Sequence, residues 1–208
     1  MKVISILNHK GGVGKSTIAT NLAGYFANAG HEVMLGDFDI QQSSQNWLGM
    51  RPDSAAPINT WEIIDGQLVT PSENTSHIII DSPAGIRAHS LKKMVSMSDK
   101  VIAPLKPGTF DMLSTQVFLE EIIEMINDQD KATDICVIGN MVDPRTKAAE
   151  QLHKFIETLG LSSPTFIRQG QIYVHLCAHG LSLFDAKNDV FAKEIEQWKP
   201  LLDWIEQE

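Results

Sequence analysis

Short apolar runs of strand length alternate along the chain with longer segments in which apolar residues recur every three or four positions. The runs are rich in β-branched residues and poor in charge, which is typical of strands buried on both faces of a parallel sheet. We expect strands at 2–7, 32–36, 77–80, 100–104, 134–140 and 165–167, and helices at 16–28, 112–127, 146–159, 171–179 and 186–205. This alternation predicts an α/β fold with one doubly wound, mostly parallel sheet flanked by helices.

Length and composition favour a single domain over residues 1–208, because 43% of the residues are hydrophobic and can form one sizeable core. Residues 49–59 lack periodicity and contain two prolines, so we expect an irregular surface connection there. No apolar run is long enough to span a membrane and the N-terminus does not resemble a secretory signal, which predicts a cytoplasmic protein. The two cysteines, Cys136 and Cys177, match no disulfide or metal pattern and are expected to be buried thiols.

A glycine-rich segment follows the first predicted strand and precedes the first predicted helix. Residues 10–17 form the sequence K-G-G-V-G-K-S-T. Glycines let successive backbone N–H groups point at one anion, and the start of the helix adds the positive end of its dipole. Lys15 would neutralise the β- and γ-phosphates of a nucleotide, and the Ser16 hydroxyl would bind Mg²⁺. The segment therefore predicts a phosphate-binding loop formed by Gly11, Gly12, Val13, Gly14, Lys15, Ser16 and Thr17.

Carboxylates follow two of the other predicted strands. Asp81 closes the run of isoleucines at 78–80, and Asp37 and Asp39 follow the strand at 32–36. Since ligands of doubly wound sheets bind at the carboxyl ends of the strands, we expect Asp39 and Asp81 beside the phosphate-binding loop. Asp37 is better explained as a structural acid that accepts backbone hydrogen bonds.

Lys10 makes the loop unusual, because a second lysine stands directly before its first glycine. In this respect K-G-G-V-G-K-S resembles the deviant Walker A motif of the ParA/MinD family of P-loop ATPases. The resemblance extends to R-Q-G-Q-I-Y-V at 168–174, which is similar to the shortest ParA proteins, those without an N-terminal DNA-binding domain.

That resemblance implies roles for individual residues. Lys10, Lys15 and Asp39 would be catalytic: Lys10 would reach the partner's phosphates across an ATP-sandwiched homodimer, and Asp39 would orient the attacking water. Mg²⁺ would be held by Ser16, Asp39 and Asp81, with Asp81 acting through water. The adenine of ATP would contact Asn140 and the proline-containing loop that ends at Pro107. Asp111 could belong to this base site or be a plain helix N-cap.

Two functions follow from the resemblance. In the first, a ParA-type ATPase dimerises on ATP, binds the nucleoid DNA without sequence preference, and hydrolyses ATP slowly until a ParB-like or cargo adaptor protein stimulates it. The cargo would be a plasmid, a chromosome region or a protein assembly. The alternative is a MinD-like membrane-associated ATPase for placing the division site, favoured by D-S-P-A-G at 81–85. The acidic C-terminus disfavours binding to an anionic membrane, so we expect no membrane partner.

The net charge of −9 argues against a generally basic nucleic-acid-binding surface. Non-specific DNA binding nevertheless needs only a local row of cations, and dimerisation doubles such a row. Each candidate could also be an ordinary solvated charge. The candidates are Arg145, Lys147, Lys154, Arg168, Lys187 and Lys193.

Overall fold

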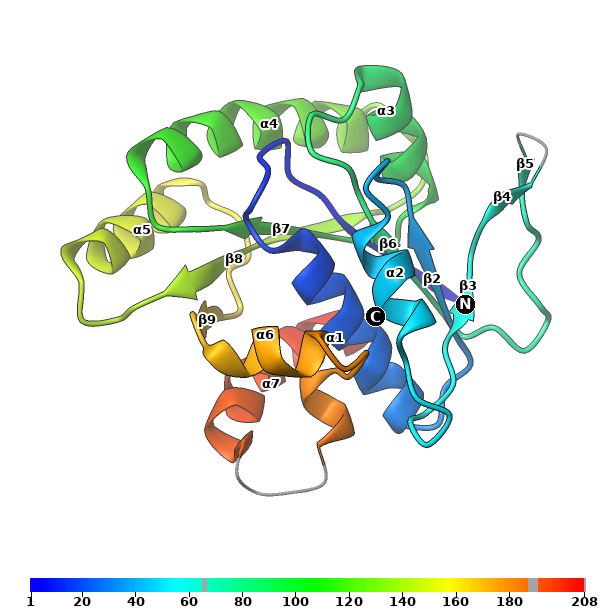
Figure 1. Ribbon diagram of the computed structural model, residues 1–208. Coiled ribbons are helices and arrows are strands. Elements are labelled where there is room, and N and C mark those ends of the chain that lie inside the picture. The colour runs from blue at the N-terminus through cyan, green and yellow to red at the C-terminus, as the bar shows by residue number, and fades with distance from the viewer. Residues whose placement is uncertain (65–66, 187–190, 208) are drawn as a thin grey trace.

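A single parallel sheet organises the chain. The computed structural model describes residues 1–64, 67–186 and 191–207 (Figure 1). Seven strands lie in the order β3-β2-β6-β1-β7-β8-β9, and every neighbouring pair is parallel. Their bounds are β1 (Lys2–Ile6), β2 (Val33–Asp37), β3 (Asn59–Thr60), β6 (His77–Asp81), β7 (Lys100–Leu105), β8 (Asp134–Val142) and β9 (Phe166–Arg168). The predicted doubly wound α/β fold is confirmed.

Helices cover both faces of this sheet because alternate strand residues point to opposite sides. Ile4 and Ile6 of β1 pack toward α1 (Lys15–Asn28), α6 (Gln171–Cys177) and α7 (Ala192–Glu206). On the other face, Val3 and Val101 pack toward α3 (Ala88–Met97) and α4 (Thr109–Asn127), while α5 (Lys147–Thr158) covers the sheet beyond β7. Figure 1 shows α3 and α4 on the side of the sheet opposite to α1, α6 and α7.

The structure contains elements that the hydrophobic pattern did not predict. These are α2 (Ser43–Gly49), α3, the 3₁₀ helix η1 (Leu183–Asp185), the two-residue strand β3, and an antiparallel hairpin of β4 (Ile63–Ile64) and β5 (Gln67–Leu68). All of them except α3 have seven residues or fewer, so their periodicity is weak. The predicted helix at 186–205 is observed as α7 from Ala192 onward, and residues 187–190 lie outside the described part of the chain.

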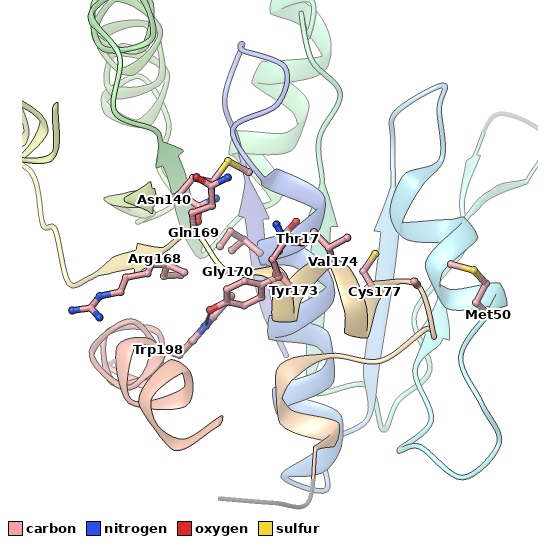
Figure 2. A pocket seen from close by; sticks show the side chains of 15 residues that line it. Thr17, Met50, Asn140, Arg168, Gln169, Gly170, Tyr173, Val174, Cys177 and Trp198 are labelled. Atoms are coloured by element: carbon pink, nitrogen blue, oxygen red, sulfur yellow. Dashed lines mark hydrogen bonds between the residues drawn. The ribbon is translucent and has the colours of Figure 1, made fainter. Parts of the chain in front are cut away.

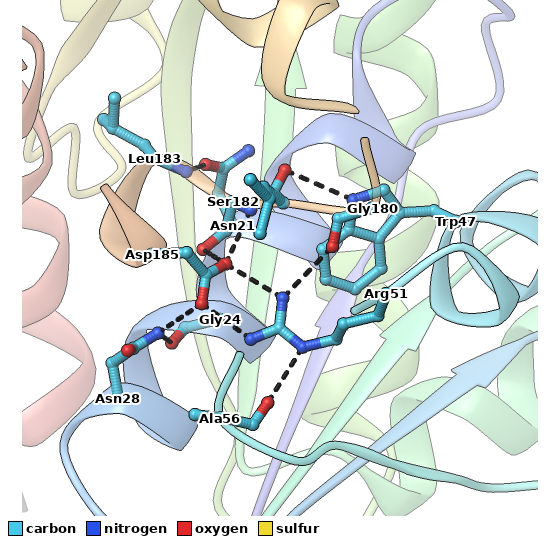
Figure 3. Close-up of polar contacts among 11 residues, drawn as sticks. Asn21, Gly24, Asn28, Trp47, Arg51, Ala56, Gly180, Ser182, Leu183 and Asp185 are labelled. Carbon is cyan, nitrogen blue, oxygen red and sulfur yellow. Dashed lines mark hydrogen bonds and ion pairs between the residues drawn. The ribbon is translucent and has the colours of Figure 1, made fainter. Parts of the chain in front are cut away.

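A buried ion pair fixes the irregular segment after α2. Arg51 forms two hydrogen bonds to the carboxylate of Asp185, at 2.8 and 2.7 Å, and Asn28 of α1 donates to the same carboxylate (Figure 3). The backbone N–H of Ser182 also donates a 2.7 Å hydrogen bond to the carboxylate of Asp185. The network joins α1, the segment after α2 and η1, so the predicted irregular connection is held in place by a few specific contacts.

The cysteines differ in exposure. Cys136 of β8 is buried as expected, but Cys177 at the end of α6 is exposed, so the prediction of a buried thiol is wrong there. Only Leu176 of the seven residues of α6 is fully buried. No helix in the described part of the chain is both long and apolar enough to cross a bilayer.

Candidate nucleotide-binding site

The loop between β1 and α1 has the conformation that phosphate binding requires. Gly12 and Gly14 have φ angles of 70° and 91°, in the left-handed region that favours glycine. A Cβ atom at Gly14 would also lie 2.2 Å from the Nδ2 atom of Asn140. Lys15 is the first residue of α1, and its Nζ donates a 3.0 Å hydrogen bond to the Lys10 carbonyl inside the loop. The lysine therefore already points into the curl of the backbone.

The pKa of Lys15 depends on its burial and on two nearby carboxylates. Burial lowers the pKa of Lys15, and the charges of Asp81 and Asp39 oppose that shift. Placing cation and carboxylates this close keeps Lys15 beside the positions that a nucleotide's phosphates and metal would occupy.

Asn8, a residue that the sequence motifs do not single out, ties the loop to β7 and to α4 through its side-chain amide. Asn8 is fully buried, and its Nδ2 donates to the Pro104 carbonyl at 2.9 Å and to Thr115 Oγ1 at 3.1 Å. Its Oδ1 accepts from the Lys10 amide at 2.9 Å. A polar residue directly after the largely apolar run 3–7 was the signal that could have identified it, since a buried amide needs partners.

Asp81 ends β6 beside this loop, in register with Ile6 of β1 and Asp37 of β2. Its side chain is buried, and neither carboxylate oxygen has a hydrogen-bond partner within the described residues. Burial raises the pKa of Asp81 to about 7; the nearby Ser16 and Ser44 hydroxyls and Lys15 oppose the shift, and Asp37 reinforces it. An unpartnered carboxylate next to a serine hydroxyl fits a hydrated Mg²⁺, because Mg²⁺ prefers oxygen ligands and retains water.

Asp37 and Asp39 have different environments although they are two residues apart. Asp37 accepts from the amides of Asp39, Ser44 and Gln45 and from the Ser44 hydroxyl, so it caps the start of α2. The structural interpretation of Asp37 is confirmed. Asp39 is half-exposed and accepts from the Gln41 amide at 3.0 Å and the Ala84 amide at 3.3 Å.

One cavity brings most of the predicted phosphate and metal residues together. It has a volume of about 450 Å³. Lys15 and Ser16 line it from the start of α1, and Asp39 lines it from the segment after β2. Its other lining residues are Gly11, Gly12, Gly14, Thr17, Gln41, Ser43, Ser82, Ala84 and Met141.

A second cavity of about 430 Å³ adjoins the first, and Thr17 and Met141 line both (Figure 2). Asn140 lies on its wall, and Tyr173 and Trp198 contribute aromatic rings. The Asn140 Nδ2 donates to the Val13 carbonyl at 2.7 Å. This largely apolar cavity beside the phosphate-binding loop has the character of a site for a planar base.

The loop between β7 and α4 does not belong to either cavity wall. Pro107 is absent from the lining residues of both, and contact of Pro107 with a base remains a prediction. Asp111 is not an N-cap, because α4 begins at Thr109 with Gly108 as its cap; Asp111 instead lies 3.8 Å from the Lys106 ammonium. The helix begins three residues earlier than its apolar periodicity suggested.

Comparison with known proteins agrees with this geometry. A model of the CobQ/CobB/MinD/ParA nucleotide binding domain matches residues 4–177. The chain belongs to this family. The resemblance seen in the motifs is thereby confirmed.

Relatives within the CobQ/CobB/MinD/ParA family include proteins with names that refer to positioning. The chain is 26% identical over 205 residues to the maintenance of carboxysome distribution protein A of Halothiobacillus neapolitanus, with 93% of each chain covered. It is 26% identical over 198 residues to the chromosome-partitioning ATPase Soj of Treponema pallidum, covering 76% of this chain and 78% of Soj. Its fold is similar to that of a Cyanothece McdA variant in complex with ATP, with a TM-score of 0.73 and 18% identity over 97% of this chain and 96% of that one.

Lys10, the residue that distinguishes the ParA/MinD loop, is half-exposed. Its backbone amide and carbonyl are both used within the loop, but its ammonium makes no hydrogen bond or ion pair to any residue that the structure describes. A contact of Lys10 with a second subunit remains a prediction.

The basic candidates fall into separate groups. Arg145 and Arg168 line a third cavity of about 540 Å³, next to the base cavity. Arg145 is paired with Asp143 at 2.9 Å, and Lys154 with Glu150 at 2.7 Å. Lys147 and Lys193 are exposed, and Lys187 lies outside the described residues.

Proposed function

We propose that the chain is a ParA-type positioning ATPase that dimerises on ATP, binds DNA without sequence preference, and is released when an adaptor protein stimulates hydrolysis. The observation that carries this proposal is the cavity at the loop, where Lys15 and Ser16 lie opposite Asp39, beside the unpartnered Asp81. These are the residue types that position phosphates, a metal and a water for hydrolysis. The names of the carboxysome-distribution and chromosome-partitioning relatives support a positioning role.

The residues divide the chemistry among them. Backbone N–H groups of the loop and the Lys15 ammonium hold the phosphates, while Ser16 would bind Mg²⁺ directly and Asp81 would hold it through water. When bound, Mg²⁺ neutralises charge on the phosphate oxygens. Asp39 accepts a hydrogen bond from the attacking water and orients it toward the terminal phosphate.

Dimerisation places Lys10 opposite the partner's nucleotide. Its ammonium has no partner among the described residues and lies beside the phosphate-binding loop, so it can neutralise phosphates across the interface. An ATP-dependent dimer also doubles the basic residues near the base cavity, which gives nucleoid DNA a larger cationic surface. We therefore propose that the protein is cytoplasmic and associates with the nucleoid, with a ParB-like or cargo adaptor as its partner.

The MinD-like alternative, a membrane-associated ATPase, rests on the D-S-P-A-G segment at 81–85. A membrane-binding helix needs a free apolar face. In α7, the last described helix, Trp198, Leu201 and Ile205 are instead fully buried in the core. Helix α7 therefore gives the MinD-like function no support.

The decisive experiment combines self-association with DNA binding. Wild-type protein with Mg²⁺ and ATP should form a dimer in light scattering and bind an arbitrary duplex in a polarisation titration at low salt, whereas ADP should support neither. Lys15→Ala, which removes the phosphate cation, should lose ATP binding in equilibrium dialysis. An ATP-bound dimer without DNA binding would exclude the nucleoid as the matrix and favour the MinD-like function.

A further inference from the structure

Helix α4 carries an exposed apolar row near the phosphate-binding loop. Phe110, Leu113 and Val117 are 82%, 56% and 67% exposed. Their spacing of three and four residues places them along one face of the first turns of the helix. Exposed contiguous apolar side chains of this size, and an aromatic one in particular, are typical of protein interaction sites.

Acidic residues continue the same face toward the C-terminal end of the helix. Helical periodicity of 100° per residue places Glu120, Glu121 and Glu124 in line with the apolar row. None of these three forms an ion pair within the described residues, and the 19-residue helix contains no lysine or arginine. Carboxylates near a helix C-terminus are unfavourable for the helix dipole, so helix stability does not explain them. We call Phe110, Leu113, Val117, Glu120, Glu121 and Glu124 the α4 face.

The buried side of the same helix is connected to the phosphate-binding loop. Thr115 accepts the hydrogen bond from Asn8, whose other side-chain atom holds the Lys10 amide. Phe118 packs against the ring of His9 at a centroid distance of 5.9 Å. A molecule that binds the α4 face therefore contacts a helix fixed directly to the nucleotide-binding loop.

We propose that the α4 face binds a basic amphipathic segment of the adaptor protein that stimulates hydrolysis, a proposal that rests on the ParA-type function above. Apolar side chains of the segment cover Phe110, Leu113 and Val117, and its lysine or arginine residues pair with Glu120 and Glu124. DNA and anionic lipid are repelled by these carboxylates.

The α4 faces of two copies of the chain do not complement each other. Parallel pairing of two α4 helices would place carboxylates against carboxylates, and antiparallel pairing would place the carboxylates of one against the apolar row of the other. Both arrangements cost free energy because they leave carboxylates repelled or unpaired. A heterologous, positively charged partner matches both halves of the face.

The test uses two fluorescent helical peptides of the same length, with leucines matching the apolar row and either lysines or glutamates matching the acidic row. Anisotropy titrations with Mg²⁺ and ATP should show binding of the lysine peptide to the wild-type protein. Glu120→Lys/Glu124→Lys should weaken that binding about tenfold and should bind the glutamate peptide instead. Phe110→Ser/Val117→Ser should weaken binding of the lysine peptide roughly fivefold or more. The matched control is Glu157→Lys/Asp203→Lys, which makes the same charge change at exposed sites on α5 and α7 and should behave as wild type.

The same variants separate failure of this inference from failure of the proposed function. The lysine peptide should raise the ATPase rate of the wild type and of the control, but not that of the α4 variants, whose basal rate and ATP-dependent dimerisation should be unchanged. Equal peptide binding by the control and the charge-swapped variant would overturn the docking site, even if ATPase activity and DNA binding are found. Loss of ATP-dependent dimerisation in Phe110→Ser/Val117→Ser would also overturn it, because the row would then belong to a self-interface. Absence of ATPase activity in the wild type would contradict the proposed function, whereas peptide anisotropy would still test the α4 face.

Discussion

The side-chain amide of Asn140 in β8 donates a 2.7 Å hydrogen bond to the carbonyl of Val13 in the phosphate-binding loop. Asn140 is buried, so this contact supports the loop from a strand two positions away in the sheet. The same residue lines the base cavity. It thus contributes to the shape of the loop as well as to the wall of the base site.

Asn140→Ala should leave the buried Val13 carbonyl unsatisfied, which costs about 1–3 kcal/mol of unfolding free energy. ATP affinity should fall as well, because the loop loses a support and the base a neighbour. Denaturant titration and equilibrium dialysis measure the two effects, with the exposed Asn59→Ala as control. Unchanged stability and ATP affinity would show that this hydrogen bond does not support the loop.

Asp39→Ala should bind ATP and dimerise but stop hydrolysing it, because the phosphate ligands are intact and only the group that orients the water is lost. The expected loss in the hydrolysis rate is on the order of 10²-fold or more. A single-turnover assay with pre-bound ATP measures this step directly. Asp37→Ala is the informative comparison, since it should mainly destabilise α2. If Asp39→Ala hydrolyses ATP at the wild-type rate, another residue orients the water.

Lys10→Ala should bind ATP as a monomer. Removing its side chain leaves both backbone hydrogen bonds of Lys10 intact, so the loop of the same subunit should be unaffected. Light scattering with ATP measures the loss of the dimer, and dialysis measures the retained affinity. An ATP-dependent dimer of normal stability would exclude the cross-subunit role of Lys10.

His77 makes stability depend on pH outside the nucleotide site. Its ring stacks on Phe26 at 3.9 Å with His31 nearby, and burial, the largest cause, lowers its pKa to about 4. The unfolded chain takes up this proton near pH 6.5, so between pH 6.5 and 4 it binds more protons than the folded chain. Stability is therefore lost as pH falls through this window.

In His77→Gln, the decrease in unfolding free energy between pH 7 and 4.5 should be smaller than in the wild type by about 1–2 kcal/mol. Denaturant titrations at the two pH values measure this difference. His89→Gln, at an exposed position on α3, is the control and should retain the wild-type pH dependence. If the unfolding free energies of the wild type and His77→Gln change equally with pH, a group other than His77 causes the pH dependence.

Residues whose role follows from their position at the end of one strand could be predicted from the sequence. Residues whose role depends on contacts with distant segments could not. Asp81 was predictable because it directly follows an apolar run, and Lys15 because it ends a glycine-rich segment between a predicted strand and a predicted helix. Helix α2 was missed because its cap is the side chain of Asp37, outside the helix itself. Asn8 was missed because its partners Pro104 and Thr115 are about a hundred residues away in sequence. Such partners become visible only when the sheet order is known.

Arg168 is the basic residue best placed to test DNA binding. It is exposed at the end of β9 and lines a cavity together with Arg145. Arg145 holds the pKa of Asp143 down at about 2 through hydrogen bonds, which shows that its own charge is committed to that carboxylate. Lys154 is similarly paired with Glu150, whereas Arg168 has no ion pair within the part of the chain that is described.

Arg168→Ala should therefore weaken binding to every duplex sequence alike, and Lys154→Ala should weaken it less. Each phosphate contact releases counterions, so loss of one contact per subunit should reduce the slope of log affinity against log salt by about 2 for the dimer. Polarisation titrations with ATP at several salt concentrations measure this slope. Because Arg168 also lines the base cavity, the ATP affinity of the variant must be measured in parallel. An unchanged salt slope at normal ATP affinity would place the DNA-binding surface elsewhere on the dimer.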